Sequence, residues 1–114
     1  MVLYRPVGHR EYELIRDRGF ASFPPRLLTQ PIFYPVLNIE YARQIASEWN
    51  ATDPSSGYRG YVLRFVVEDA YLARFEVKTV GASRHQEYWI PADELEEFNR
   101  HIVGCIDAVE EYSG

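Results

Sequence analysis

The amino-acid sequence predicts a single α+β domain over residues 1–114, and three observations lead to that prediction. The chain has 114 residues, close to the commonest domain size. The run YRGYVLRFVV at residues 58–67 is apolar and β-branched enough for a central strand. The segment 39–50 has the spacing of one main amphipathic helix, with an apolar face made by Tyr41, Ala42, Ile45, Ala46 and Trp49.

The first half of the chain predicts strands and helices separated by glycine and proline. Residues 2–7 form an opening strand, and residues 9–18 form a short helix that stops before Gly19. Residues 20–30 contain Pro24-Pro25 and are expected to be an extended loop. A second strand follows at residues 31–36, and Asn38 caps the amphipathic helix, whose Trp49 is expected to pack onto the sheet.

The second half is richer in strands. After the turn-rich loop at 50–57 and the central strand, the expected elements are a helical turn at 68–74, strands at 75–80 and 86–90, a helix at 92–98 and a last strand at 102–109. Helices are thus early and strands late, without the alternation of a parallel α/β fold and without a GxGxxG or P-loop motif.

Composition and charge exclude several classes of protein. The net charge of −5 argues against a broad nucleic-acid-binding surface, and no apolar run reaches the length of a membrane span. No secretory signal is visible, and no Cys/His cluster has metal-ligand spacing, so a cytoplasmic protein without a metal site is expected. The single cysteine, Cys105, lies in the apolar run IVGCI and is expected to be a buried, inert thiol.

Three polar side chains lie within predicted strands, between apolar neighbours: Arg5, Tyr34 and Glu87. In QEYWIP, residues 86–91, strand alternation directs Tyr88 and Ile90 to the core. Glu87 and Trp89 then share the opposite face, where a carboxylate and a large aromatic ring are placed side by side. Arg5, Tyr34 and Glu87 are therefore candidates for side chains that point into a cleft.

The motifs LYRPV, PIFYPVLN, EYARQIA and QEYWIPADEL, in this order, resemble the ADP-ribosyltransferase-like fold. In that fold an early strand carries Arg or His, a later one carries an aromatic residue or serine, and a late strand carries the catalytic glutamate. The chain also resembles short bacterial proteins labelled "ADP-ribosylation/crystallin", over most of its length. The resemblance implies split, strongly bent β-sheets around a cleft, with the helix at 39–50 packed on one side.

The resemblance also implies an activity: NAD, bound as substrate, is cleaved at its nicotinamide–ribose bond by an ADP-ribosyltransferase or NAD glycohydrolase. Glu87 would then be the catalytic carboxylate, Tyr34 would stack on nicotinamide, and Arg5 would hold the ribose or pyrophosphate. Trp89 would shape the pocket, and Arg26 would contact a phosphate. The acceptor stays open between protein, nucleic acid, small molecule and water.

An alternative is a catalytically silent binding or interaction module of the same fold. The set Arg5, Tyr34 and Glu87 is a hybrid of the family's two usual sets, and no Ser-Thr-Ser follows Tyr34. Each candidate also has a structural interpretation: Arg5 as a surface strand residue, Tyr34 as a core or rim residue, and Glu87 as a solvated residue paired with Arg84. Arg26 would be a surface loop residue, and Glu94, Glu96 and Glu97 a solvated helix face.

Overall fold

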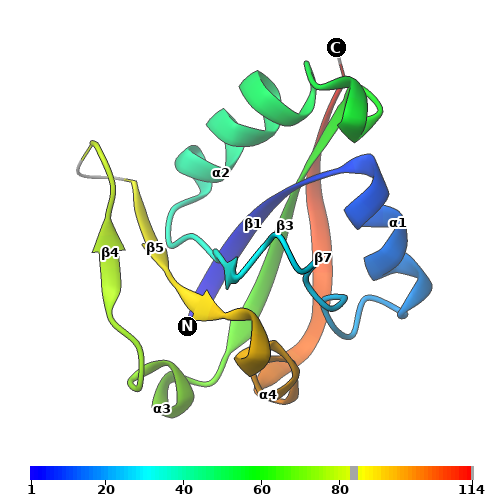
Figure 1. Ribbon diagram of the computed structural model, residues 1–114. Coiled ribbons are helices and arrows are strands. Elements are labelled where there is room, and N and C mark those ends of the chain that lie inside the picture. The colour runs from blue at the N-terminus through cyan, green and yellow to red at the C-terminus, as the bar shows by residue number, and fades with distance from the viewer. Residues whose placement is uncertain (83–84, 114) are drawn as a thin grey trace.

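A three-stranded antiparallel sheet forms the centre of the molecule (Figure 1). The structure is a computed structural model that describes residues 1–82 and 85–113. In the sheet, β3 (Arg59–Val67) lies between β1 (Val2–Gly8) and β7 (Ile102–Ser113). The prediction of an α+β fold is confirmed, and the run at 58–67 is the central strand of this sheet.

Two short antiparallel pairs lie beside the central sheet. β2 (Ile32–Phe33) pairs with β6 (Ile90–Pro91), and β4 (Val77–Thr79) pairs with β5 (Gln86–Tyr88). Val36 forms isolated bridges with Tyr4 of β1 and with Glu87 of β5. Val36 and its two neighbours, whose backbone groups bond to β5, therefore join the β4–β5 hairpin to the edge of the central sheet.

The helices are short and lie around the sheet. They are α1 (His9–Asp17), α2 (Ile39–Ile45), α3 (Asp69–Leu72) and α4 (Leu95–Arg100). The Asn38 side chain accepts hydrogen bonds from the backbone N–H groups of Glu40 and Tyr41, as expected for an N-cap. After Ile45 the chain continues as a π-helical turn, η1 (Ala46–Asn50). Within the described residues, no helix is long and apolar enough to cross a membrane.

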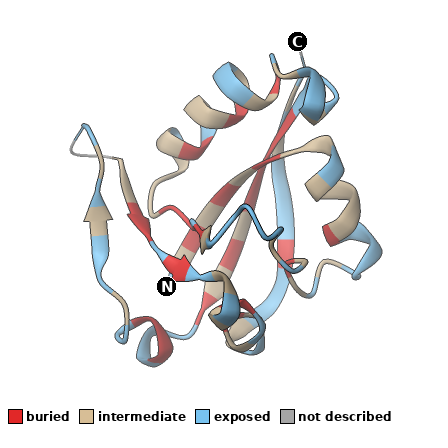
Figure 2. Ribbon diagram, viewed as in Figure 1, coloured by how far each residue is buried: buried red, intermediate tan, exposed pale blue. Residues whose placement is uncertain are grey.

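The two faces of the central sheet bury different clusters. Buried positions, coloured red in Figure 2, lie along the strands of this sheet. On one face, Leu63 and Phe65 of β3 pack with Ile15 of α1 and Phe98 of α4. On the other face, Val62 packs against the small residues of α2 and η1, Ala42 and Ala46, together with Val36. Because successive side chains on a strand alternate in direction, β3 contributes to both clusters and holds α1 and α2 on opposite faces.

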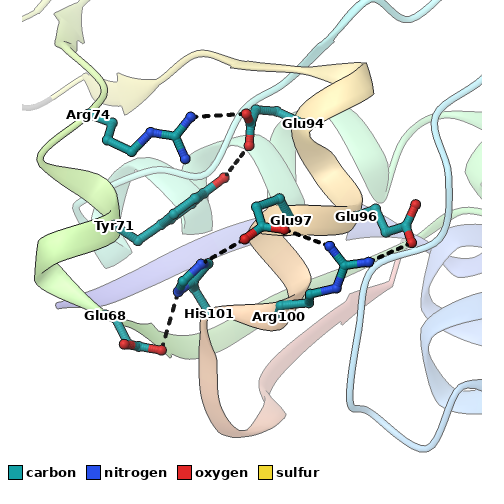
Figure 3. Close-up of polar contacts among 8 residues, drawn as sticks. All are labelled: Glu68, Tyr71, Arg74, Glu94, Glu96, Glu97, Arg100 and His101. Carbon is teal, nitrogen blue, oxygen red and sulfur yellow. Dashed lines mark hydrogen bonds and ion pairs between the residues drawn. The ribbon is translucent and has the colours of Figure 1, made fainter.

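A polar network connects α3 to α4 (Figure 3). The Tyr71 hydroxyl donates to Glu94 at 2.8 Å, and Arg74 donates to the same carboxylate at 3.1 Å. His101 stacks on Tyr71 with ring centroids 4.2 Å apart, and its ring nitrogens lie beside the carboxylates of Glu68 and Glu97. The expectation of a solvated face is therefore wrong for Glu94.

Several expected boundaries differ from the observed ones. The expected strand at 31–36 is reduced to β2 and the bridge at Val36, because Pro31 and Pro35 have no N–H for a ladder hydrogen bond. The strand at 75–80 is shorter than expected, and the strand beginning at 102 extends to Ser113. The expected strand at 86–90 is broken at Trp89 into β5 and β6.

Two predictions about side-chain burial are wrong. Trp49 is 69% exposed, because the wide turn η1 directs it away from the sheet while Ala42 and Ala46 make the contact. Cys105 is exposed, because β7 is an edge strand with its neighbour Ile106 buried on the opposite face. Tyr88 and Ile90 are buried, as strand alternation predicts.

Candidate functional site

A pocket of about 390 Å³ lies where β1, β5, α2 and the segment after β2 meet. It is lined by Arg5, Pro6, Tyr34, Val36, Ile45, Glu87 and Trp89. The pocket, called the site pocket below, brings together the three candidate catalytic residues and Trp89. These residues come from segments far apart in the sequence, and the bridges of Val36 to β1 and β5 hold those segments side by side.

Glu87 is a buried carboxylate with two neutral hydrogen-bond donors. Its side chain is on β5 and only 7% of the residue is exposed. The Tyr41 hydroxyl donates to Oε2 at 3.2 Å, and the Trp89 indole N–H donates to Oε1 at 2.8 Å. The solvated interpretation of Glu87 is therefore wrong, and its suggested partner Arg84 lies outside the described residues. Because an unpaired buried charge is costly, the two donors explain how the carboxylate can stay in the pocket wall.

Tyr41 is a contact of Glu87 that the sequence analysis missed. Burial raises the pKa of the Tyr41 hydroxyl, and the charge of Glu87 and their hydrogen bond raise this pKa further. The ring stacks on His85 with centroids 4.3 Å apart, and His85 Nε2 lies 3.2 Å from Gln44 Oε1. Tyr41 therefore remains a proton donor to Glu87 at neutral pH. Helical spacing assigned it to the apolar face of α2, and no local pattern indicates this long-range bond.

Tyr34 and Trp89 form the aromatic part of the site pocket. Their rings meet edge to face, with centroids 6.2 Å apart and an interplanar angle of 87°. Tyr34 is 39% exposed and Trp89 is 42% exposed, so a planar group has access to either ring. Lys78 Nζ lies 5.4 Å from the centroid of the Trp89 ring, within the range of a cation–π contact. Tyr34 follows β2 and is not in the middle of a strand, contrary to expectation.

Arg5 is held in place by an acidic residue that follows it on α1. Nε of Arg5 donates to Glu11 Oε2 at 2.7 Å, and Nη2 donates to Glu11 Oε1 at 3.0 Å. The guanidinium carbon lies 4.5 Å from the centroid of the buried Phe33 ring. Only 7% of Arg5 is exposed, so the surface interpretation is wrong. The guanidinium forms part of the wall of the site pocket, and its positive charge is paired with the negative charge of Glu11.

Arg26 is not in the site pocket. It lines a second pocket of about 540 Å³, between α1, the loop at 24–30 and the loop at 50–56, and this second pocket is called the arginine pocket below. Arg26 donates to the carbonyl of Ile32 at 3.1 Å, and its Nη1 lies 3.9 Å from Glu11. Burial lowers the pKa of Arg26, and the nearby charge of Arg5 lowers it further. Its side chain is 11% exposed, so the interpretation as a surface loop residue is wrong.

The site pocket thus presents a fixed carboxylate, two accessible aromatic rings and a guanidinium. Among residues 1–82 and 85–113, no group of His, Cys, Asp and Glu side chains is placed to hold a metal ion. A pocket lined by a carboxylate, a guanidinium and two aromatic rings can bind a planar group attached to a hydroxylated, anionic moiety. Comparison with family models, curated proteins and solved structures finds no significant match to this chain.

Proposed function

We propose that this chain is an NAD-dependent ADP-ribosyltransferase or NAD glycohydrolase with an ADP-ribosyltransferase-like fold. The main support for the proposal is that Arg5, Tyr34 and Glu87 line one pocket. Trp89 lies beside the carboxylate and donates a hydrogen bond to it. A pocket in which polar and aromatic side chains from separate segments meet is the default hypothesis for a binding or active site. The split arrangement, in which Val36 joins the β4–β5 hairpin to β1, is consistent with the proposed fold.

In the proposed reaction the bond between the ribose C1′ and the nicotinamide nitrogen breaks, and its electron pair leaves with neutral nicotinamide. The ribose becomes oxocarbenium-like, and the acceptor or water then attacks C1′ and loses a proton. Glu87 stabilises the developing positive charge and accepts hydrogen bonds from the ribose hydroxyls. A carboxylate has about four acceptor positions, so the bonds from Tyr41 and Trp89 leave capacity for the substrate.

The other residues of the site bind and orient. Tyr34 and Trp89 offer ring surface to nicotinamide and keep water away from the carboxylate. Arg5 faces the site pocket and is bonded to Glu11, which lines the arginine pocket together with Arg26. The NAD diphosphate would lie along these arginines, with the nicotinamide end in the site pocket.

The test is nicotinamide release from NAD by the wild type and by Glu87→Gln. The substitution removes the charge that acts mainly in the transition state, so the rate is expected to fall by roughly a hundredfold or more. The new amide has one acceptor oxygen for two donors, and the free energy of unfolding is expected to fall by roughly 1–3 kcal/mol. Melting curves of both proteins therefore accompany the rates. Glu96→Gln is the matched control for the loss of one charge, because Glu96 is highly exposed on α4 and pairs with Arg100, outside the site pocket.

Equal rates for the wild type and a folded Glu87→Gln variant would overturn the assignment of Glu87. A second function, a silent binding module, is favoured by a specific observation: Arg5 already donates to Glu11 through Nε and Nη2 and to the Tyr34 carbonyl through Nη1, and both oxygens of Glu87 already accept bonds from the chain itself. Such a module raises its melting temperature with NAD but releases no nicotinamide. An enzyme shows both the rise in melting temperature and the release of nicotinamide, so measuring the two distinguishes an enzyme from a silent module.

A further inference from the structure

Glu11 is the shared acidic partner of two arginines that the proposed function assigns to an anionic ligand. It forms a two-point ion pair with Arg5 at 2.7 and 3.0 Å, and its Oε1 also lies 3.9 Å from Arg26. Both guanidinium carbons lie over the ring of the buried Phe33, at 4.5 and 5.9 Å from its centroid. Phe33 therefore fixes both cations in the same small region, and Glu11 lies between them.

The charges of this cluster do not balance. Arg5 and Arg26 carry two positive charges, Glu11 carries one negative charge, and Arg10 lines the same pocket as Glu11 and Arg26. Burial lowers the pKa of Arg26, the charge of Arg5 lowers it further, and the charge of Glu11 opposes this shift. The region is thus locally positive in a chain whose net charge is −5. A further anion would be stabilised here.

Hydrogen-bonding capacity points to the same place. In the described part of the chain, two buried side-chain atoms have no hydrogen-bond partner: Nε of Arg26 and Oδ1 of Asn50. Both residues line the arginine pocket. Buried polar atoms are nearly always bonded in folded proteins, so Arg26 keeps one unsatisfied donor, which is the kind of group that an anion needs. The Asn50 oxygen is an acceptor and does not itself favour an anion. Ser55 and Ser56 add hydroxyl groups to the same lining.

We propose that Glu11 is an internal competitor for anionic ligands: a diphosphate group binds Arg5 and Arg26 only by exchanging with the Glu11 carboxylate. This inference rests on the proposed function, which needs the NAD diphosphate at these arginines. Glu11 then sets the affinity of the site and raises its selectivity. A ligand has to offer both the diphosphate, to replace the carboxylate, and a planar group for the rings of the site pocket, to offset the cost of exchange.

The experiment measures binding of inorganic pyrophosphate by calorimetry, because this probe contains the anionic group alone. Glu11→Gln removes the competing charge and is expected to bind pyrophosphate about tenfold tighter than the wild type, or more. Glu13→Gln is the matched control, because Glu13 is on the same helix and pairs with Arg16 and His9 instead. The double variant Glu11→Gln/Arg26→Gln is expected to lose the gain. The gain is also expected to shrink as salt is raised.

Equal pyrophosphate affinity of the wild type and Glu11→Gln, or an equal gain in Glu13→Gln, would overturn the inference. Glu11→Asp is the second variant in case Glu11→Gln does not fold, since it keeps the charge but is too short for both arginines. Glu11→Asp is expected to bind pyrophosphate more tightly than the wild type does. Equal or weaker binding of pyrophosphate by Glu11→Asp would contradict the proposal. Nicotinamide release is measured separately. If the wild type cleaves NAD but Glu11→Gln binds pyrophosphate no more tightly, the role of Glu11 as a competitor is disproved while the proposed function stands.

Discussion

At the residue scale, the environment of Glu87 couples stability to the candidate chemistry. Its two donors come from different elements, Tyr41 from α2 and Trp89 from the break between β5 and β6. A carboxylate held from two directions cannot rotate freely, so its oxygens stay directed into the site pocket. The same two bonds compensate its burial. Positioning of the carboxylate and local stability therefore depend on the same atoms.

We expect Tyr41→Phe to destabilise the protein while keeping its ring contact with His85. The substitution removes a hydrogen bond to a buried charged group, so the free energy of unfolding should fall by roughly 1–3 kcal/mol in urea titrations. Tyr58→Phe is the control, because Tyr58 is half exposed and loses only a solvated hydroxyl. Nicotinamide release should fall less than in Glu87→Gln, since the carboxylate itself remains. Unchanged stability in Tyr41→Phe would show that the bond to Glu87 contributes nothing.

Strand alternation was enough to predict that Tyr88 and Ile90 are buried and that Glu87 and Trp89 share the other face, but it did not predict that Glu87 is buried as well. The partners of these residues could not be predicted in the same way. Glu11 lies six positions after Arg5, but their ion pair depends on how α1 folds back over β1. Tyr41 reaches Glu87 across the join at Val36. These contacts depend on tertiary structure, for which the spacing of residues in the sequence gives no signal.

At the element scale, α2 and η1 approach the central sheet unusually closely. Gly60 of β3 lies against the backbone of η1: a Cβ atom built on Gly60 would be 2.1 Å from the carbonyl oxygen of Ala46. The small residues Ala42 and Ala46 complete the contact with Val62. This close packing places Ile45 in the wall of the site pocket and Asn50 in that of the arginine pocket. The glycine therefore supports both candidate binding surfaces.

We expect Gly60→Ala to separate η1 from β3. The new methyl group meets backbone and cannot be accommodated by a side-chain rotation, so the cost should be about 3 kcal/mol or more in thermal or urea unfolding. Gly19→Ala is the control, because a Cβ atom at Gly19 has nothing within 4 Å and only its positive φ of 68° causes strain. That variant should lose about 1–2 kcal/mol. A smaller loss in Gly60→Ala than in Gly19→Ala would contradict the close approach.

Element boundaries were predictable where local chemistry decides them. Asn38 marks the start of α2 because its side chain caps two backbone N–H groups. β7 extends past residue 109 for a different reason: Glu110 to Ser113 pair with Arg59 to Val62 of β3, and only this pairing makes the polar segment a strand. The two glutamates at 110 and 111 do not themselves favour a strand. Long-range pairing outweighs local propensity there.

At the scale of the whole molecule, a three-residue segment connects two sheet regions. Val36 exchanges backbone hydrogen bonds with Tyr4 of β1, and its neighbours Pro35 and Leu37 bond to Tyr88 and Gln86 of β5. The sequence predicts the class, α+β, from the order of its elements. It does not predict that this short segment joins β1 to β5, because isolated bridges leave no periodic pattern. The site pocket lies at this junction, and its geometry follows from the global arrangement.

The molecule as a whole is expected to lose stability at alkaline pH. Burial raises the pKa of Tyr41, Tyr71 and Tyr88 above the usual 10.0, and hydrogen bonding to Glu94 raises that of Tyr71 further (Figure 3). In the unfolded chain these hydroxyls ionise near pH 10, while in the folded chain they keep their protons. Unfolding therefore releases protons above pH 10, and stability that is fully present below this pH is lost as pH rises towards the folded-state pKa values.

The expected loss is up to about 1.4 kcal/mol per pH unit for each such tyrosine, measured by urea unfolding at a series of pH values between 8 and 11. Tyr71→Phe removes one of these groups: it should be less stable than the wild type at pH 8, because Glu94 loses a donor, but its stability should fall less steeply above pH 10. Tyr58→Phe, at an exposed position, should keep the wild-type slope. The contrary outcome is a wild-type stability that stays constant up to pH 11. It would show that these tyrosines ionise as easily in the folded chain as in the unfolded one. The buried hydrogen bonds of Tyr41 and Tyr71 would then have to be rejected.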